Sequence, residues 1–151
     1  MDRTAERRLW DRIGRPSVSA IEPRGSLEIF VPSGTLCVTR GSGVLSLSMA
    51  RKWIVALEPL FAKGARMSCF HDWAEVVDYE AEARHAIGRW TVRRARACEE
   101  IQMLTTSNLL PLAVAALNVA TNVAGLEIQA TSDRETFYER LGERVAARVP
   151  R

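Results

Sequence analysis

Residues 26–45 read SLEIFVPSGTLCVTRGSGVL. Within this stretch two runs rich in aliphatic and β-branched residues, 27–31 and 35–39, are separated by a Pro-Ser-Gly step. Short apolar runs on either side of such a step predict a β-hairpin. Gly41 and Gly43 come next, and glycines at this spacing indicate the end of the second strand. The sequence therefore predicts an antiparallel pair of strands at the start of a sheet.

Beyond the hairpin, helical and extended patterns alternate. A helix is expected from a cap at Ser46 or Ser48 to about residue 63, because Gly64 is a natural stop after a helix. The other expected elements, in chain order, are a strand at 66–70, a helix at 80–98, a strand at 101–105, a helix capped by Ser107 or Asn108, a strand at 126–131, and a last helix that opens at a capping box of Ser132 and Glu135.

Strands separated by helices of ~10–20 residues pair in parallel through right-handed crossovers. The predicted fold class is therefore α/β, with a single mixed, mostly parallel sheet of about five strands and four helices. The opening hairpin adds the antiparallel part of the sheet.

Residues 1–25 differ from the rest, because Gly14, Pro16, Pro23 and Gly25 interrupt regular structure repeatedly. We expect a loosely packed N-terminal arm here, or a helix that docks only against a partner. Residues 26–151 are expected to form one α/β domain, since domains cluster near ~100–150 residues.

The composition excludes several classes of protein. Lys and Arg number 21 against 18 Asp and Glu, and several arginines lie near the two ends of the chain rather than in one cluster. Nucleic-acid binding is therefore not expected, because nucleic-acid binders concentrate basic residues on one face. The longest apolar run, 109–120, is too short to span a bilayer. The first residues carry no secretory signal, so the expected location is the cytoplasm.

Three cysteines, Cys37, Cys69 and Cys98, lie far apart and form no CxxC pair. An odd count without ligand spacing argues against a disulfide framework and against a zinc site. No metal and no cofactor are predicted.

A polar cluster follows the strand expected at 66–70, and it contains His71, Asp72 and Asp78. Sites of α/β proteins often lie at such strand ends. One interpretation makes His71 a general base that an aspartate orients. In the other, Asp72 or Asp78 caps the following turn and His71 ends the strand. Neither a GxSxG motif nor a glycine-rich phosphate loop accompanies the cluster, so no catalytic residue is assigned.

The segment 89–97 reads RWTVRRARA and interleaves basic with apolar residues. This pattern fits a phosphate-binding or partner-binding face. It also fits an ordinary amphipathic helix whose arginine stems cover apolar surface, which is the favoured interpretation.

From about residue 27 to residue 146 the chain resembles the STAS domain, the anti-sigma-factor-antagonist fold. The likeness lies in the hairpin, the β/α alternation and a helix entered through an acidic loop. That loop reads roughly D-x-S-x-V-x-x-I-D-S-S-G in the family, where a serine at the helix N-terminus is phosphorylated. Here residues 72–80 read DWAEVVDYE, in which Val77-Asp78 matches the apolar-Asp step, while Tyr79 and Glu80 stand at the serine pair.

The resemblance implies a non-enzymatic regulatory module that binds a protein partner. The implied binding residues are His71, Asp72, Asp78, Tyr79 and Glu80. Serine phosphorylation is not expected at this site, and Glu80 would supply a permanent negative charge, which a helix N-terminus favours.

The chain also resembles the STAS-like group with a SEC14-like apolar cavity. The nearly all-apolar stretch 109–120 supports this resemblance. It implies an alternative function, the binding of a small apolar ligand or a lipid.

Overall fold

The computed structural model describes residues 1–106, 114, 115, 117, 118 and 121–147. Their strands form one sheet in the order β1-β2-β3-β4-β5-β6. The strands are β1 (Val18–Glu22), β2 (Gly25–Ser33), β3 (Leu36–Leu45), β4 (Met67–Tyr79), β5 (Cys98–Leu104) and β6 (Ile128–Thr131). The described helices are α1 (Arg3–Ile13), α2 (Leu47–Phe61), α3 (Ala81–Arg94) and α5 (Arg134–Ala146), with short 3-10 turns at Ala95–Ala97 and Asn122–Ala124.

The predicted fold class is confirmed. β2 and β3 form the antiparallel hairpin, and the pairs β3–β4, β4–β5 and β5–β6 are parallel. The sheet has one strand more than expected, because β1 pairs with β2 in antiparallel fashion. The helix expected after Ser107 or Asn108 falls mainly on 107–113, 116, 119 and 120, which lie outside the described residues.

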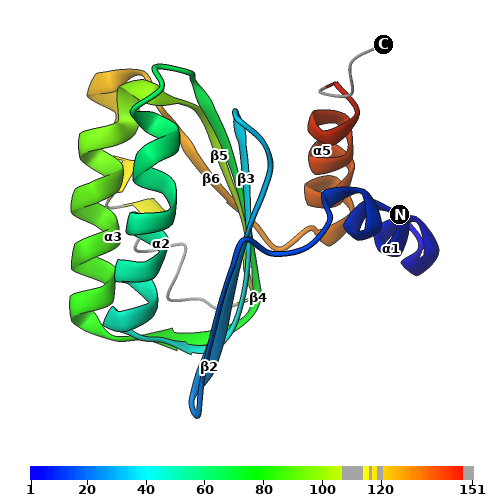
Figure 1. The fold of residues 1–151 in the computed structure, drawn as a ribbon, viewed down its shortest axis with the longest axis horizontal. Helices are drawn as coiled ribbons and strands as arrows, with labels where there is room; N and C mark the ends of the chain where they lie inside the picture. Colours follow the sequence, from blue (N-terminus) through cyan, green and yellow to red (C-terminus); the bar gives the residue numbers. More distant parts are fainter. Residues whose placement is uncertain (107–113, 116, 119–120, 148–151) are drawn as a thin grey trace.

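Helices cover both faces of the sheet (Figure 1): α2 and α3 lie on one face, and α1 and α5 lie on the other. Apolar side chains alternate between the two faces along the strands, as the twofold strand repeat requires. Cys69 packs under α2 and α3, whereas its neighbour Phe70 packs against Phe137 of α5.

Residues 1–25 are not a loosely packed arm, so that expectation was wrong. Leu9 of α1 is 1% exposed and Ile13 is also buried, both in the core that α5 closes. β1 is hydrogen-bonded to β2. Three of the four residues that suggested a loosely packed arm lie between the elements: Gly14 and Pro16 separate α1 from β1, and Pro23 lies in the turn after β1. The fourth, Gly25, begins β2.

The strand predicted at 66–70 is much longer in the structure, because β4 continues to Tyr79. Its partner β3 continues through Gly41 and Gly43, which were wrongly predicted to end it. Gly43 has a φ of 66°, and a β-carbon there would collide with the carbonyl oxygen of Arg24. The glycine therefore permits a close approach of two chain segments within the sheet. The residues expected in an acidic loop, 72–80, instead lie in β4 up to Tyr79, and this part of β4 pairs with β3.

α2 begins as predicted, with Ser46 as its cap: the Ser46 hydroxyl accepts a hydrogen bond from the Met49 N–H at 3.2 Å. α3 is shorter than the predicted 80–98, since it ends at Arg94 and β5 already begins at Cys98.

The start of the last helix was predicted one residue early. Asp133, not Ser132, is the cap of α5, and its carboxylate accepts hydrogen bonds from the N–H and the hydroxyl of Thr136. The capping box of Ser132 and Glu135 does not form.

Replacing Asp133 by alanine is therefore expected to lower the free energy of unfolding by about 0.5–2 kcal/mol, the usual loss for a helix cap. Ser132→Ala is the matched control and should stay within about 0.5 kcal/mol of the unmodified chain. Urea unfolding followed by circular dichroism measures both. A larger loss for Ser132→Ala than for Asp133→Ala would contradict this assignment of the cap.

Candidate functional site

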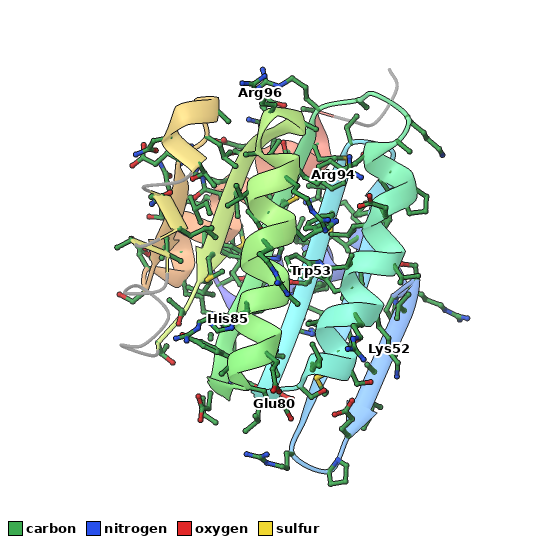
Figure 2. All side chains as sticks on the ribbon, turned by 90° about the vertical axis from the view of Figure 1, so that its left-hand side faces the viewer. Lys52, Trp53, Glu80, His85, Arg94 and Arg96 are labelled. Carbon is green, nitrogen blue, oxygen red and sulfur yellow. The ribbon has the colours of Figure 1, made fainter. Side chains whose placement is uncertain are left out.

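Residues 77–80, called here the β4–α3 junction, lie where two β-α connections meet. The Glu80 N–H donates to the carbonyl oxygen of Leu45 at 2.9 Å, and the Glu80 carboxylate accepts from the N–H of Leu47 at 2.9 Å. Glu80 thus precedes α3 in the chain but caps the N-terminus of α2 with its side chain. In Figure 2 it lies at the end where both helices begin. A carboxylate there is favoured by the partial positive charge of the helix N-terminus.

The junction presents mixed chemistry at the surface. Val77 is 65% exposed, and Asp78 is exposed beside it. The Asp78 carboxylate accepts from the N–H of Tyr79 at 2.8 Å, which fixes its direction. The guanidinium of Arg84 lies 5.8 Å from the centroid of the Tyr79 ring. Three of the five predicted site residues are therefore adjacent at the surface: Asp78 is exposed, and Tyr79 and Glu80 are half-buried.

His71 lies elsewhere, buried beneath α2 and α3. Its Nδ1 is 2.7 Å from the Thr39 hydroxyl oxygen, which also accepts from the indole N–H of Trp73 at 3.0 Å. With its oxygen accepting from Trp73, the Thr39 hydroxyl can use its own hydrogen to donate to Nδ1 of a neutral imidazole in the Nε2–H tautomer. The ring of Trp53 packs edge-on against His71. Burial lowers the pKa of His71 to about 4, so the residue is uncharged at neutral pH.

Asp72 faces the opposite side of the sheet, because consecutive residues of a strand point to opposite faces. The hydroxyl of Tyr138 in α5 donates to the Asp72 carboxylate, which also accepts from the Ala74 N–H at 3.3 Å. Burial, together with the Asp72 charge, raises the pKa of Tyr138. The sheet therefore separates the Asp72 carboxylate from His71, and the pair considered for general-base chemistry does not form.

The contact between Asp72 and Tyr138 is the part of this region that the sequence did not predict. It forms one wall of a polar cleft of about 290 Å³, which two ion pairs, Arg134–Glu6 and Arg40–Glu28, also line. One feature of the sequence pointed to the contact between Asp72 and Tyr138. Tyr138 lies on the buried stripe of α5, and a buried tyrosine hydroxyl usually has a hydrogen-bond partner.

The three cysteines are free thiols buried in the core under α2 and α3. Burial raises the pKa of Cys37 to about 12, so this thiol is not a nucleophile at neutral pH. Within the described part of the chain, no group of three or more His, Cys, Asp or Glu side chains is placed to hold a metal ion.

An apolar cavity of about 60 Å³ lies beside these cysteines, walled by Trp53, Trp73 and Trp90 among others. Pockets for small organic ligands run from ~300 to 1,000 Å³. This cavity is therefore several times smaller than a pocket for a small organic ligand. No helix among the described residues is long and apolar enough to cross a membrane.

Comparison with known proteins identifies the fold. No protein-family model matches the chain, and no curated protein matches it in sequence. A crystal structure does match: an uncharacterized protein of the DUF3478 family from Shewanella loihica PV-4, described as having a SpoIIAA-like fold. The two structures superpose with a TM-score of 0.56 over 83% of this chain and 99% of the other, at 14% sequence identity.

The chain has a SpoIIAA-like fold. This confirms the resemblance to the STAS domain at the level of the fold. The predicted acidic loop, residues 72–80, corresponds in the structure to the second half of β4 and Glu80, and its last four residues form the junction.

Proposed function

We propose that this chain is a non-enzymatic, SpoIIAA-like regulatory module that binds a protein partner through the β4–α3 junction. One observation carries the proposal: the junction combines an exposed apolar side chain, Val77, with the exposed carboxylate of Asp78. A patch that joins apolar surface to fixed polar groups is typical of protein interfaces.

Hydrogen bonds to the backbone hold Glu80, at one end of this patch, in place. Glu80 bonds to the backbone on both sides of Ser46, at Leu45 and Leu47. A preformed surface loses little conformational entropy on binding, which favours affinity. The buried free thiols are compatible with a reducing compartment, which supports a cytoplasmic location.

Two other functions have less support. The candidate catalytic residues His71 and Asp72 are buried, hydrogen-bonded within the protein and directed to opposite faces. The apolar-ligand alternative needs a larger cavity than the roughly 60 Å³ beside Trp53 and Trp90.

The test begins with native co-purification, with mass spectrometry to identify the bound protein, followed by titration of that protein. Glu80→Gln should keep the domain folded, because the amide oxygen can still accept from Leu47, and a charge at a helix N-terminus stabilises by only ~0.3–1 kcal/mol. Affinity for the partner should fall about tenfold, which is roughly 1.4 kcal/mol.

The control variant is Glu22→Gln, a half-exposed carboxylate at the end of β1. It should bind the partner as the unmodified chain does. If Glu80→Gln and Glu22→Gln bind the partner with equal affinity at both low and high salt, the junction is not the binding surface.

A further inference from the structure

A groove between α2 and α3 opens next to the junction. The surface depression over these two helices is lined on the α2 side by Leu47, Arg51 and Ile54. These residues recur at a spacing of four and three, so they form one stripe along the helix. A matching stripe on α3 consists of Glu82, Ala86, Arg89 and Arg93. Figure 2 shows the two helices side by side on this face of the molecule.

The floor of the groove is apolar and only partly covered. Leu47, Ile54 and Ala86 are half-buried. Val55, next to this stripe on α2, is 72% exposed. Large apolar side chains at helical spacing in a groove between helices are typical of surfaces that receive an amphipathic helix.

The rim of the groove carries unbalanced positive charge. Arg51, Arg89 and Arg93 are exposed, and none of the three forms an ion pair with a residue that the structure describes. Arg94, by contrast, is bound to Glu58 of α2, which also accepts from the Trp90 indole at 2.6 Å. Glu58 thus neutralises Arg94, whereas Arg51, Arg89 and Arg93 have no ion-pair partner among the described residues. Arg84 also lines the groove, and its guanidinium lies against the Tyr79 ring of the junction.

We propose that the groove between α2 and α3 binds an acidic amphipathic helix of the partner protein. The inference rests on the proposed protein-binding function and adds the chemistry of the partner. Apolar side chains of the partner helix lie on Leu47, Ile54 and Ala86, and its carboxylates face the three arginines.

The apolar floor distinguishes this partner from other polyanions. A nucleic acid contacts such a surface mainly through its phosphates, which gain nothing from Ile54 or Val55. A flat anionic membrane does not reach the floor of a groove between two helices. A helix with one apolar and one acidic face matches both the floor and the rim.

The probe is a synthetic amphipathic peptide of about four helical turns, roughly 14 residues, with leucine and alanine on one face and glutamate beside them. A second peptide carries lysine at every glutamate position. Fluorescence anisotropy with the full chain measures Kd for both. The acidic peptide should bind more tightly at low salt than at high salt, and the basic peptide should not bind.

The deciding variants reverse charge. In Arg89→Glu/Arg93→Glu the affinity for the acidic peptide should fall at least tenfold, and the basic peptide should now bind. The matched control, Arg8→Glu/Arg12→Glu, makes the same change in net charge on exposed positions of α1. It should leave the affinity within about twofold. Circular dichroism of both double variants verifies that they are folded.

Three results would overturn the inference. The first is no binding of the acidic peptide to the unmodified chain, and the second is an equal loss of affinity for this peptide in both double variants. The third is arginine-dependent binding of duplex nucleic acid or anionic vesicles without binding of the acidic peptide. These results are distinct from failure of the proposed function, because the junction is tested with the natural partner and Glu80→Gln.

Discussion

Acidification from about pH 7 to about pH 4 is expected to destabilise the folded chain through His71. Burial lowers the pKa of this imidazole from 6.5 to about 4. Below pH 6.5 the unfolded chain binds a proton at His71, whereas the folded chain does not until about pH 4. Above pH 6.5, the pKa of this group in the unfolded chain, His71 therefore does not change the stability. The free energy of unfolding falls as the pH drops from 6.5 to about 4. The two pKa values correspond to a loss of roughly 3 kcal/mol.

Denaturant melts of single variants at several pH values isolate this contribution. His71→Asn retains a side-chain acceptor for Thr39 but cannot titrate. Between pH 6.5 and pH 4 this variant should lose less stability than the unmodified chain, and the difference should be most of the roughly 3 kcal/mol assigned to His71. His85→Asn, at an exposed position of α3, is the matched control and should follow the unmodified chain. An unchanged pH dependence in His71→Asn would show that His71 titrates normally.

Leu9→Ala is expected to cost about 2–5 kcal/mol in the free energy of unfolding. Leu9 is 1% exposed and belongs to the core between α1, α5 and the sheet. Removing a fully buried leucine side chain loses its transfer free energy and leaves a cavity. Arg8→Ala, one position earlier and exposed, should stay within about 0.5 kcal/mol. Urea unfolding measures both variants.

This prediction also tests the boundary at residue 25 that the sequence suggested. If residues 1–25 were a dispensable arm, Leu9→Ala and Arg8→Ala would unfold at the same urea concentration. The contacts of Leu9, and the pairing of β1 with β2, instead make this segment part of the folded core.

The candidate site could be predicted only in part. The run 72–80 drew attention to Asp78, Tyr79 and Glu80 through its resemblance to the STAS loop, and the structure places these three residues next to one another at the β4–α3 junction. The same run gave no indication that the Glu80 carboxylate bonds to Leu47, 33 residues earlier. Nor did it indicate that Asp72 meets Tyr138, 66 residues later.

The length of β4 was missed for a related reason. Polar residues such as His71 and Asp72 in succession are typical of a loop, and the glycines of β3 are typical of its end. Both segments are strands because they pair with each other, from Leu36↔Ser68 to Leu45↔Tyr79. Backbone hydrogen bonds between distant segments override the local preference of single residues.

What the sequence determined by itself was the α/β class, the hairpin and the alternation of helices with strands. Those features follow from local apolar spacing and from caps such as Ser46, which act within a few residues. The tertiary structure alone decided which face each polar residue occupies, that α1 belongs to the core, and that the stripes of α2 and α3 form a groove. These depend on sheet register and on burial against distant elements, because a shift of one residue in register exchanges the two faces of a strand.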